Sequence, residues 1–334
     1  MALEAAYLAS IAAIFVSSFL LTYFITPIMI HKIAKRGIVG QDMNKFSRPQ
    51  VPEMGGISII LGVSLGIITA TLISTYFGFF SLDLTVLFAS FLTIILVGFI
   101  GVIDDLIGWR QGIRQWQHAL FPLFAALPLM AVNAGTHQIV LPFIGGVSLG
   151  ILYSLLLVPI GITGASNAFN MLAGFNGLEA GMGIIIVSTL SVIAALYGKP
   201  EALVIGISIV GALLAFLRYN WFPAKVFGGD SLTLLIGAGI ATISIIGNME
   251  KVGLALIALY WVEFLFKARH NFQSQNFGIP DRHGFLRPDP KGGSLTHVMM
   301  SLGNFTEVQV VRNFLCLQLG ISAVVFLMFY FRLF

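Results

Sequence analysis

Residues 84–103 read Leu-Thr-Val-Leu-Phe-Ala-Ser-Phe-Leu-Thr-Ile-Ile-Leu-Val-Gly-Phe-Ile-Gly-Val-Ile, without a charged side chain, and Asp104 and Asp105 follow at once. An uncharged run of this length can cross the hydrocarbon core of a bilayer as a helix. The rest of the chain has the same character, because 57% of its 334 residues are hydrophobic and 10% are charged. The composition excludes an ordinary soluble domain and predicts an all-α, polytopic membrane protein.

Ten apolar runs of membrane-spanning length follow one another along the chain. They cover residues 5–30, 56–80, 84–103, 116–132, 146–163, 180–197, 202–219, 231–248, 252–268 and 310–331. We therefore expect about ten transmembrane helices in a single integral membrane domain over residues 1–334. The first run shows no cleavage site after a short apolar core, so we expect it to be retained rather than removed as a signal peptide.

Positive charges distinguish the two sides of this predicted bundle. The loops after the odd-numbered runs, with the adjoining helix ends, hold fifteen lysines and arginines, whereas the other side holds only Lys199, Lys251 and Arg332. This bias predicts that the first set of loops faces the cytoplasm and that both termini lie outside. Most carboxylates and a long loop over residues 266–309 belong to the same side. We therefore expect an active site on the cytoplasmic face, in the plasma membrane or, in a eukaryote, the endoplasmic reticulum.

The stretch from Ser166 to Ala180 differs from the apolar sequence around it. It places Asn167, Asn170 and Asn176 around two glycines, Gly174 and Gly177. Each carboxamide needs a hydrogen-bond partner once it leaves water, and glycine weakens a helix by about 1 kcal/mol against alanine. We expect a loop here that lets a ligand approach the main chain.

Asp104 and Asp105 are adjacent carboxylates at the predicted end of a helix. They repel each other, and the partial negative charge of a helix C-terminus disfavours them further. A cation would make the pair tolerable, and Mg²⁺ fits, since it takes one or two protein carboxylates and completes its shell with substrate phosphates. The alternative is a boundary marker that stops the helix from sliding into the membrane.

Three other polar stretches belong to the same predicted side. In Lys225–Ser231, Asp230 suits the start of a helix, where it could bind a ligand or cap the helix, and Phe227 could stack on a base or anchor the interface. Residues 280–287 hold arginines that suit phosphate, or alternatively anionic lipid headgroups, and His283 can donate a hydrogen bond. Residues 41–56 form a turn-rich segment, or a mere connector, that ends in a glycine pair.

In combination and in order, these stretches resemble the polyprenyl-phosphate N-acetylhexosamine-1-phosphate transferases over about residues 20–300. The shared motifs are Asp42-Met-Asn-Lys, Pro52-Glu-Met-Gly-Gly56, Asp104-Asp105, Asn167-Ala-Phe-Asn170, Ala173-Gly-Phe-Asn-Gly-Leu-Glu179, Asn220-Trp, Phe227-Gly-Gly-Asp230 and Arg282-His283. Within the family, the chain looks most like the eukaryotic and archaeal dolichyl-phosphate N-acetylglucosamine-phosphotransferase branch. The bacterial cell-wall enzyme has aspartates where this chain has Ala173 and Asn176.

The resemblance implies ten transmembrane helices and a cytosolic site that depends on Mg²⁺, with Mn²⁺ as a substitute. It implies a UDP-N-acetylhexosamine donor and a polyprenyl or dolichyl phosphate acceptor within membrane lipids, implies no nucleic acid, and leaves a homodimer open. By motif position, the resemblance implies that Asn170 and Asp230 bind the metal and that Met43, Gly174, Asn176 and Phe227 bind the nucleotide. It implies that Arg114 and Arg282 contact the diphosphate and that Glu53 and His283 contact the sugar. Asp104 and Asp105 are the implied catalytic pair.

The function so implied is transfer of N-acetylhexosamine-1-phosphate, with N-acetylglucosamine as the expected sugar, to the lipid phosphate. The products are a lipid-diphosphate-sugar and UMP, at the first membrane step of glycan assembly, with N-glycans as the expected class. Gly108 and Gly284 stand where relatives often have polar or charged residues, so the sequence does not select the sugar. Direct transfer is favoured over a phospho-enzyme because it requires fewer special roles.

Two other classes of protein are compatible with a helical membrane bundle. A secondary transporter normally places its binding groups near the bilayer midplane. Here nearly every ionisable residue maps to a helix end or a loop, except Glu263, whose spacing to Lys267 suits an i,i+4 ion pair. The second alternative is a non-catalytic protein that binds lipid phosphate. Mg²⁺-dependent release of UMP distinguishes the enzyme from both.

Overall fold

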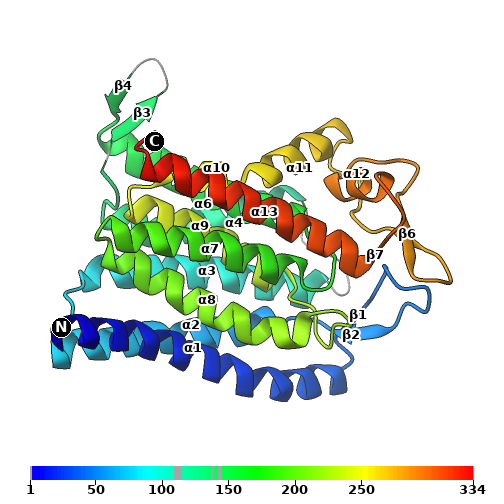
Figure 1. Cartoon of the computed structure of the whole chain (residues 1–334), viewed down its shortest axis with the longest axis horizontal. Helices are drawn as coiled ribbons and strands as arrows, with labels where there is room; N and C mark the ends of the chain where they lie inside the picture. The colour runs from blue at the N-terminus through cyan, green and yellow to red at the C-terminus, as the bar shows by residue number, and fades with distance from the viewer. Residues whose placement is uncertain (1, 109–114, 137, 142–144, 334) are drawn as a thin grey trace.

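The computed structural model describes residues 2–108, 115–136, 138–141 and 145–333, and helices dominate it (Figure 1). In chain order the elements are α1 (Ala2–Lys35), β1 (Val39–Gln41), β2 (Gln50–Pro52), α2 (Gly56–Phe77), α3 (Leu84–Gly108), α4 (Gln115–Ala125), α5 (Leu127–Ala131), β3 (Gln138–Leu141), β4 (Gly145–Ser148), the π-helix η1 (Tyr153–Leu157), α6 (Val158–Met171), α7 (Leu178–Leu196), α8 (Pro200–Asn220), α9 (Asp230–Ile246), α10 (Glu250–Leu256), α11 (Ala258–Arg269), β5 (Ile279–Pro280), β6 (Phe285–Arg287), α12 (Leu295–Ser301), β7 (Phe305–Thr306) and α13 (Glu307–Tyr330).

Six helices in the described part of the chain are long and apolar enough to cross a membrane, which confirms an all-α, polytopic membrane protein. These spans are Glu4–Lys35, Gly56–Phe77, Leu84–Ile107, Leu178–Leu196, Pro200–Asn220 and Glu307–Tyr330. The other four predicted runs coincide with shorter helices, namely α4 with α5, η1 with α6, α9 alone, and α10 with α11. Proline near the start of α5 and a non-helical Ile257 between α10 and α11 mark two of the breaks.

The fifth predicted run was placed wrongly at both ends. It was expected to be helical over 146–163, but Gly145–Ser148 pairs with β3 as an antiparallel hairpin, and the helix continues to Met171. Glycine is a poor helix former, which favours the hairpin at the first end. At the second end, the Asn167 amide donates to the main-chain oxygen of Thr163 at 2.9 Å, one turn back in the helix. Asn167 and Asn170 are therefore helical, and only residues 172–177 form a loop.

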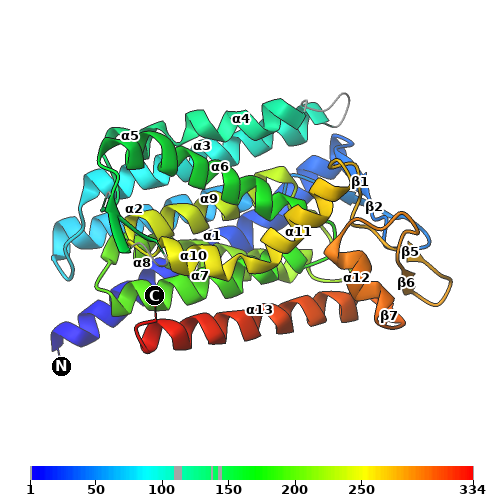
Figure 2. The same cartoon turned by 90° about the horizontal axis from the view of Figure 1, so that it is seen from above.

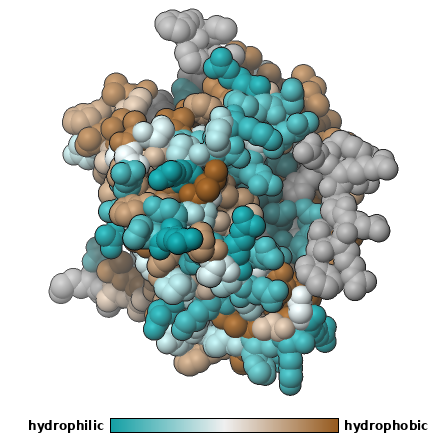
Figure 3. Space-filling model, turned by 90° about the vertical axis from the view of Figure 1, so that its right-hand side faces the viewer, coloured by the Kyte–Doolittle hydropathy of each residue, from teal (hydrophilic) through white to brown (hydrophobic). Residues whose placement is uncertain are grey.

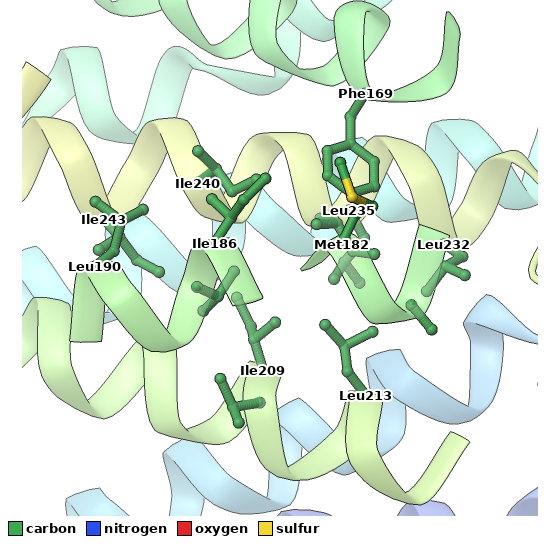
Figure 4. Close-up of a cluster of buried hydrophobic side chains, with 14 of the residues drawn as sticks. Phe169, Met182, Ile186, Leu190, Ile209, Leu213, Leu232, Leu235, Ile240 and Ile243 are labelled. Atoms are coloured by element: carbon green, nitrogen blue, oxygen red, sulfur yellow. The ribbon is translucent and has the colours of Figure 1, made fainter. Parts of the chain in front are cut away.

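Helix α9 lies at the centre of the bundle. It packs against α3 and α6, while α8 packs against α1, α2 and α7. Every residue of α9 from Ser231 to Ile245 is buried. Its apolar side chains, such as Leu235, pack with those of α6, α7 and α8, among them Phe169, Met182 and Ile209 (Figure 4). This arrangement fixes the position of the first residue of α9, Asp230, relative to the ends of its neighbours.

The two ends of the bundle differ. Both termini lie at one end, and the β1–β2 hairpin, the sheet β5–β6–β7 and α12 lie at the other (Figures 1 and 2). In the hairpin, Val39 pairs with Pro52 and Gln41 with Gln50. At the same end, the predicted loop over residues 266–309 is a folded segment that contains three short strands and the helix α12. Hydrophilic residues gather on this end of the molecule (Figure 3).

Candidate active site

A cavity of about 260 Å³ lies between the loop segments and the helix ends at the hydrophilic end. Seven of the predicted site residues line it, and they come from three separate stretches of the chain: Met43, Glu53, Asn170, Gly174, Asn176, Phe227 and Asp230. Gln41, Asp42, Glu179, Asn220, Thr233 and Phe277 also line it. The structure thus gathers the predicted metal and nucleotide residues at one place.

Asp105 connects α3 to the first turn of α9. Its carboxylate accepts hydrogen bonds from the main-chain nitrogen of Asp230 at 2.7 Å and from the Ser231 hydroxyl at 2.7 Å. The main-chain nitrogen of Ser231 donates to it at 3.2 Å. A helix N-terminus carries partial positive charge, so these contacts make a carboxylate tolerable at this position. The N-terminus of α9 is therefore a hydrogen-bonding partner of the Asp105 carboxylate.

The capping role considered for Asp230 is wrong. The N-cap residue of α9 is Gly229, which has φ 72° and no side chain to offer, and Asp230 is the first helical residue. A Cβ at Gly229 would lie 2.4 Å from a carboxylate oxygen of Asp105, and one at Gly101 would lie 2.5 Å from the main-chain carbonyl of Asp230. Two glycines therefore permit the close approach of α3 to the start of α9. Asp230 is positioned as a cavity residue rather than as a cap.

Asn170 reaches the same cavity from the last turn of α6. Its carboxamide oxygen accepts a hydrogen bond of 3.1 Å from the hydroxyl of Thr233 on α9. The two helices pack closely because Gly237 faces α6, where a Cβ would lie 2.4 Å from the main-chain oxygen of Ala165. The packing of one helix pair thus brings Asn170 and Asp230 to the same cavity.

The donor set around Asp230 fits Mg²⁺. Burial, together with the negative charge of Asp230, raises the pKa of Glu53 above its ordinary value, so a cation would relieve the repulsion between these two acids. Asn170 adds an amide oxygen. Among the described residues, no cluster of three or more His, Cys, Asp or Glu side chains could hold a metal by itself. Mg²⁺ is commonly held by one or two carboxylates and by substrate phosphates, which matches such a partial set.

Glu53 and Phe227 are held by main-chain pairing between their segments. The Phe227 nitrogen donates to the oxygen of Pro52 at 2.8 Å, and the Phe227 oxygen accepts from the nitrogen of Gly55 at 2.9 Å. Gly56, the first residue of α2, donates to the oxygen of Gly228 at 2.9 Å. Two motifs far apart in the sequence therefore form one wall of the cavity.

The loop over residues 172–177 supplies main-chain groups to the cavity. Gly174 has φ +119°, and a Cβ there would lie 2.8 Å from the ring of Phe277. Its oxygen accepts a 2.8 Å hydrogen bond from the amide of Asn44, whose own oxygen accepts from the nitrogen of Gly278 at 2.9 Å. Asn44 therefore joins the loop to the segment that follows α11. A glycine is needed at position 174 for both the φ angle and the space.

Asn176 is held at two points by carboxylates. Its side-chain nitrogen donates to Asp42 at 3.0 Å, and its main-chain nitrogen donates to Glu307 at 2.8 Å. Lys45 forms ion pairs with both acids, at 3.2 Å from Glu307. Asp42 and Glu307 are each 3% exposed. Neither acid was among the predicted site residues, although Asp42 belongs to one of the motifs that carried the resemblance.

Asn276 supports the same loop from behind. Its amide nitrogen donates to the main-chain oxygens of Met171 and Ala173 at 2.7 and 2.6 Å, and its oxygen accepts from Lys267 at 2.5 Å. Lys267 also pairs with Glu263 at 3.6 Å, which confirms the predicted i,i+4 pair on α11. Nothing in the sequence distinguished Asn276 from the other polar residues of its segment.

Four of the predicted residues that the structure describes do not line the cavity, namely Asp104, Asp105, Arg282 and His283. Arg282 and His283 are exposed on the turn between β5 and β6, where Asp281 accepts from the main-chain nitrogen of His283 at 2.8 Å. Asp104 is 8% exposed, next to Asp105 on α3. Arg114 lies outside the described residues. Among the residues that the structure describes, the predicted nucleotide and metal residues are gathered at the cavity, whereas Arg282 does not line it.

Comparison with known proteins supplies the family. The model of glycosyl transferase family 4 matches residues 87–248. A protein of Saccharolobus solfataricus with the provisional name UDP-N-acetylglucosamine--dolichyl-phosphate N-acetylglucosaminephosphotransferase is 40% identical over 302 residues, which cover 88% of this chain and 89% of that one. A protein of Sulfolobus acidocaldarius with the same provisional name is 37% identical over 88% of each chain.

A bacterial relative is more distant. The phospho-N-acetylmuramoyl-pentapeptide-transferase of Limosilactobacillus reuteri is 30% identical over 74% of this chain and 78% of that one. The archaeal proteins carry the kind of name that the Ala173–Glu179 motif predicted, and identity to them extends over most of both chains. On this evidence the chain belongs to glycosyl transferase family 4, in agreement with the transferase family that its motifs indicate.

Proposed function

We propose that this protein transfers N-acetylglucosamine-1-phosphate from UDP-N-acetylglucosamine to a polyprenyl phosphate of the dolichyl type. The observation that carries the proposal is the single cavity that joins the oxygen ligands Asn170 and Asp230 to the loop of Gly174 and Asn176. The names of the archaeal relatives supply the substrate pair. The products are a lipid-diphosphate-sugar and UMP.

The reaction joins two anions. An oxygen of the lipid phosphate attacks the β-phosphorus of the donor, a new P–O bond forms, and the bond from this phosphorus to the bridging oxygen breaks. UMP leaves with that oxygen. The acceptor is largely a dianion at neutral pH, because the second pKa of a phosphate monoester is about 6. Neutralisation of charge and alignment therefore contribute more to the rate than a strong base does.

The cavity residues divide this work between them. Asn170 and Asp230 would hold Mg²⁺, with Glu53 beside them toward the sugar, and the bound ion would supply charge neutralisation at the diphosphate. Met43, the Gly174 main chain and Asn176 bind the uracil, and Phe227 stacks on it. The proposed roles of the others are Arg114 and Arg282 at the diphosphate, His283 at the sugar, and Asp104 at the acceptor phosphate. Asp105 positions Asp230 through the start of α9.

We also propose a ten-span topology in the plasma membrane. The shorter helices α4 with α5, η1 with α6, α9, and α10 with α11 add four spans to the six long ones. The cavity end faces the cytosol, because the loops there carry most lysines and arginines. The chain is one integral membrane domain, and residues 266–309 complete its site.

One assay tests the reaction. The detergent-solubilised protein is incubated with UDP-N-acetylglucosamine and dolichyl phosphate, and released UMP is measured with Mg²⁺ and with EDTA. We expect UMP and a lipid product in stoichiometric amounts, only when metal and acceptor are both present. UDP-glucose and UDP-N-acetylgalactosamine serve as comparison donors. Transport of the intact nucleotide sugar into liposomes without UMP release would overturn the proposal in favour of a transporter.

A further inference from the structure

We infer that Asp42, Lys45 and Glu307 form a positioning triad in which Asp42 dictates which atom of the Asn176 side chain faces the nucleotide, and so favours a base that presents a ring N–H donor. The inference rests on the proposed function, which places uracil against Asn176. It assigns a task to three charged residues that line or adjoin the cavity.

The first step concerns the orientation of the Asn176 carboxamide. Asp42 contacts it at 3.0 Å, and an ionised carboxylate only accepts hydrogen bonds. The amide nitrogen must therefore face Asp42, and the amide oxygen lies on the other edge of the planar group. Glu307 also accepts a hydrogen bond from the main-chain nitrogen of Asn176, which fixes the main chain from which this side chain extends.

The second step concerns what holds the Asp42 carboxylate in place. Lys45 forms ion pairs with both Asp42 and Glu307, and its ammonium lies 4.6 Å from the centre of the Phe222 ring. Two buried carboxylates side by side would otherwise repel each other, and buried charges are stable only when paired. Lys45 therefore maintains the acceptor that orients Asn176.

The third step connects this orientation to base selection. Uracil carries a hydrogen on the ring nitrogen at position 3, and cytosine has an unprotonated acceptor there. An Asn176 amide oxygen that faces the base accepts a hydrogen bond from the N3–H of uracil. With cytosine the same oxygen faces the lone pair of N3, and no hydrogen bond forms between them. Leaving a buried polar group unpaired is costly, so we expect UMP to bind at least about tenfold more tightly than CMP.

The test compares two variants of Asp42. In Asp42→Ala the acceptor is gone and the Lys45 ammonium remains, so the amide turns its oxygen toward Lys45 and its nitrogen toward the base. We expect the ratio of UMP to CMP affinity, measured by titration calorimetry, to fall by at least about tenfold. Asp42→Asn keeps one oxygen in the place that accepts from Asn176 and Lys45, and we expect it to retain a ratio within about threefold of the unaltered protein.

Two further variants separate orientation from general damage. Glu307→Gln still offers an oxygen to the Asn176 main chain but loses an ion pair with Lys45. It should weaken UMP and CMP alike and leave their ratio unchanged. Glu250→Ala removes a carboxylate that is hydrogen-bonded to Tyr153 outside the cavity, and both affinities should stay the same.

The outcomes are distinct. If Asp42→Ala is folded and keeps the UMP to CMP ratio of the unaltered protein, the triad does not orient Asn176 and the inference is wrong. If Asp42→Ala cannot be purified, Asp42→Leu, which also lacks an acceptor, carries the same expectation. Failure of the unaltered protein to bind UMP would overturn the proposed function itself. Normal UMP release with an unmoved ratio would overturn the triad alone.

Discussion

The carboxylate of Asp105 lies 2.7 Å from the main-chain nitrogen of Asp230 and accepts its hydrogen, so the end of α3 caps the start of α9 across the helix interface. The contact exists because Gly229 and Gly101 leave room for it. The contact also gives the two adjacent acids of α3 different roles. Asp105 is occupied by a helix N-terminus, and Asp104 is the member of the pair that we assign to the acceptor.

Replacing Asp105 tests this cap. We expect Asp105→Ala to lower both the thermal unfolding midpoint and UMP release, because a lost helix cap costs about 1 kcal/mol and Asp230 loses its support. Asp105→Asn keeps an oxygen for the α9 amides and should retain more of both. An Asp105→Ala protein with unaltered stability and turnover would show that α9 needs no such support.

Asp104 should affect the chemical step more than donor binding. It does not line the cavity that holds the predicted nucleotide residues. We expect Asp104→Ala to reduce turnover by at least about a hundredfold, the low end for loss of an acid–base or electrostatic group, while UDP-sugar affinity changes only a few-fold. Equal losses in both would assign Asp104 to the donor site or to structure. No loss in either would make it a helix boundary marker.

Asp230→Asn separates ligand binding from stability. Since Gly229 is the N-cap of α9, the Asp230 carboxylate is not required as a cap. The change also removes a negative charge near Glu53 and Asp105, so we expect the variant to remain folded. Turnover should be abolished, together with any Mg²⁺ dependence of UDP-sugar binding. Turnover equal to that of the unaltered protein would remove Asp230 from the metal site.

Asn176→Asp introduces a carboxylate where the amide now donates to Asp42 at 3.0 Å. A like charge replaces a hydrogen bond, and the new side chain can only accept from a base. We expect UMP affinity to fall by at least about tenfold, the effect of leaving one buried hydrogen bond unmade. Asn167→Asp is the control, because Asn167 bonds within α6 and does not line the cavity. Equal UMP affinities for both variants would exclude Asn176 from the base site.

Asn276 should matter through the loop that it supports. Its amide makes three hydrogen bonds, and we expect Asn276→Ala to destabilise the fold by roughly 2–4 kcal/mol, at about 1 kcal/mol for each bond. Faster hydrogen exchange in residues 171–177 and a higher KM for the UDP-sugar should accompany the loss. The exposed neighbour Gln275 provides the matched control, Gln275→Ala. Unchanged exchange in the loop would contradict the supporting role.

The sequence predicts the membrane helices well where a single apolar run forms a single long helix, as at residues 56–77 and 84–108. It predicts less where the chain bends. Hydropathy does not distinguish a hairpin at Gly145–Ser148 from the start of a helix, and a carboxamide such as Asn167 can pair within its own helix. The sequence therefore predicts a loop around Gly174 and Gly177 correctly, but it extends that loop too far back, over the helical residues Asn167 and Asn170.

The candidate site was predictable to the extent that local motifs carry it. Seven predicted residues meet in one cavity because each belongs to a short pattern with its own chemistry. Glu307 and Asn276 have no such pattern, and they act through main-chain groups more than a hundred residues away. Contacts of that kind depend on how the helices pack, which periodicity and charge counts do not specify.

The ion pair between Lys45 and Glu307 joins an early and a late part of the chain, so it can form only at the end of synthesis. A ribosome delivers the β1–β2 hairpin after the first helix, but it delivers Glu307 only with the last one. Until α13 enters the bilayer, Lys45 has one carboxylate partner and the main-chain nitrogen of Asn176 lacks its acceptor. In a nascent chain the proposed nucleotide pocket would therefore be incomplete, and we expect productive binding of the donor only once insertion of the whole bundle has finished.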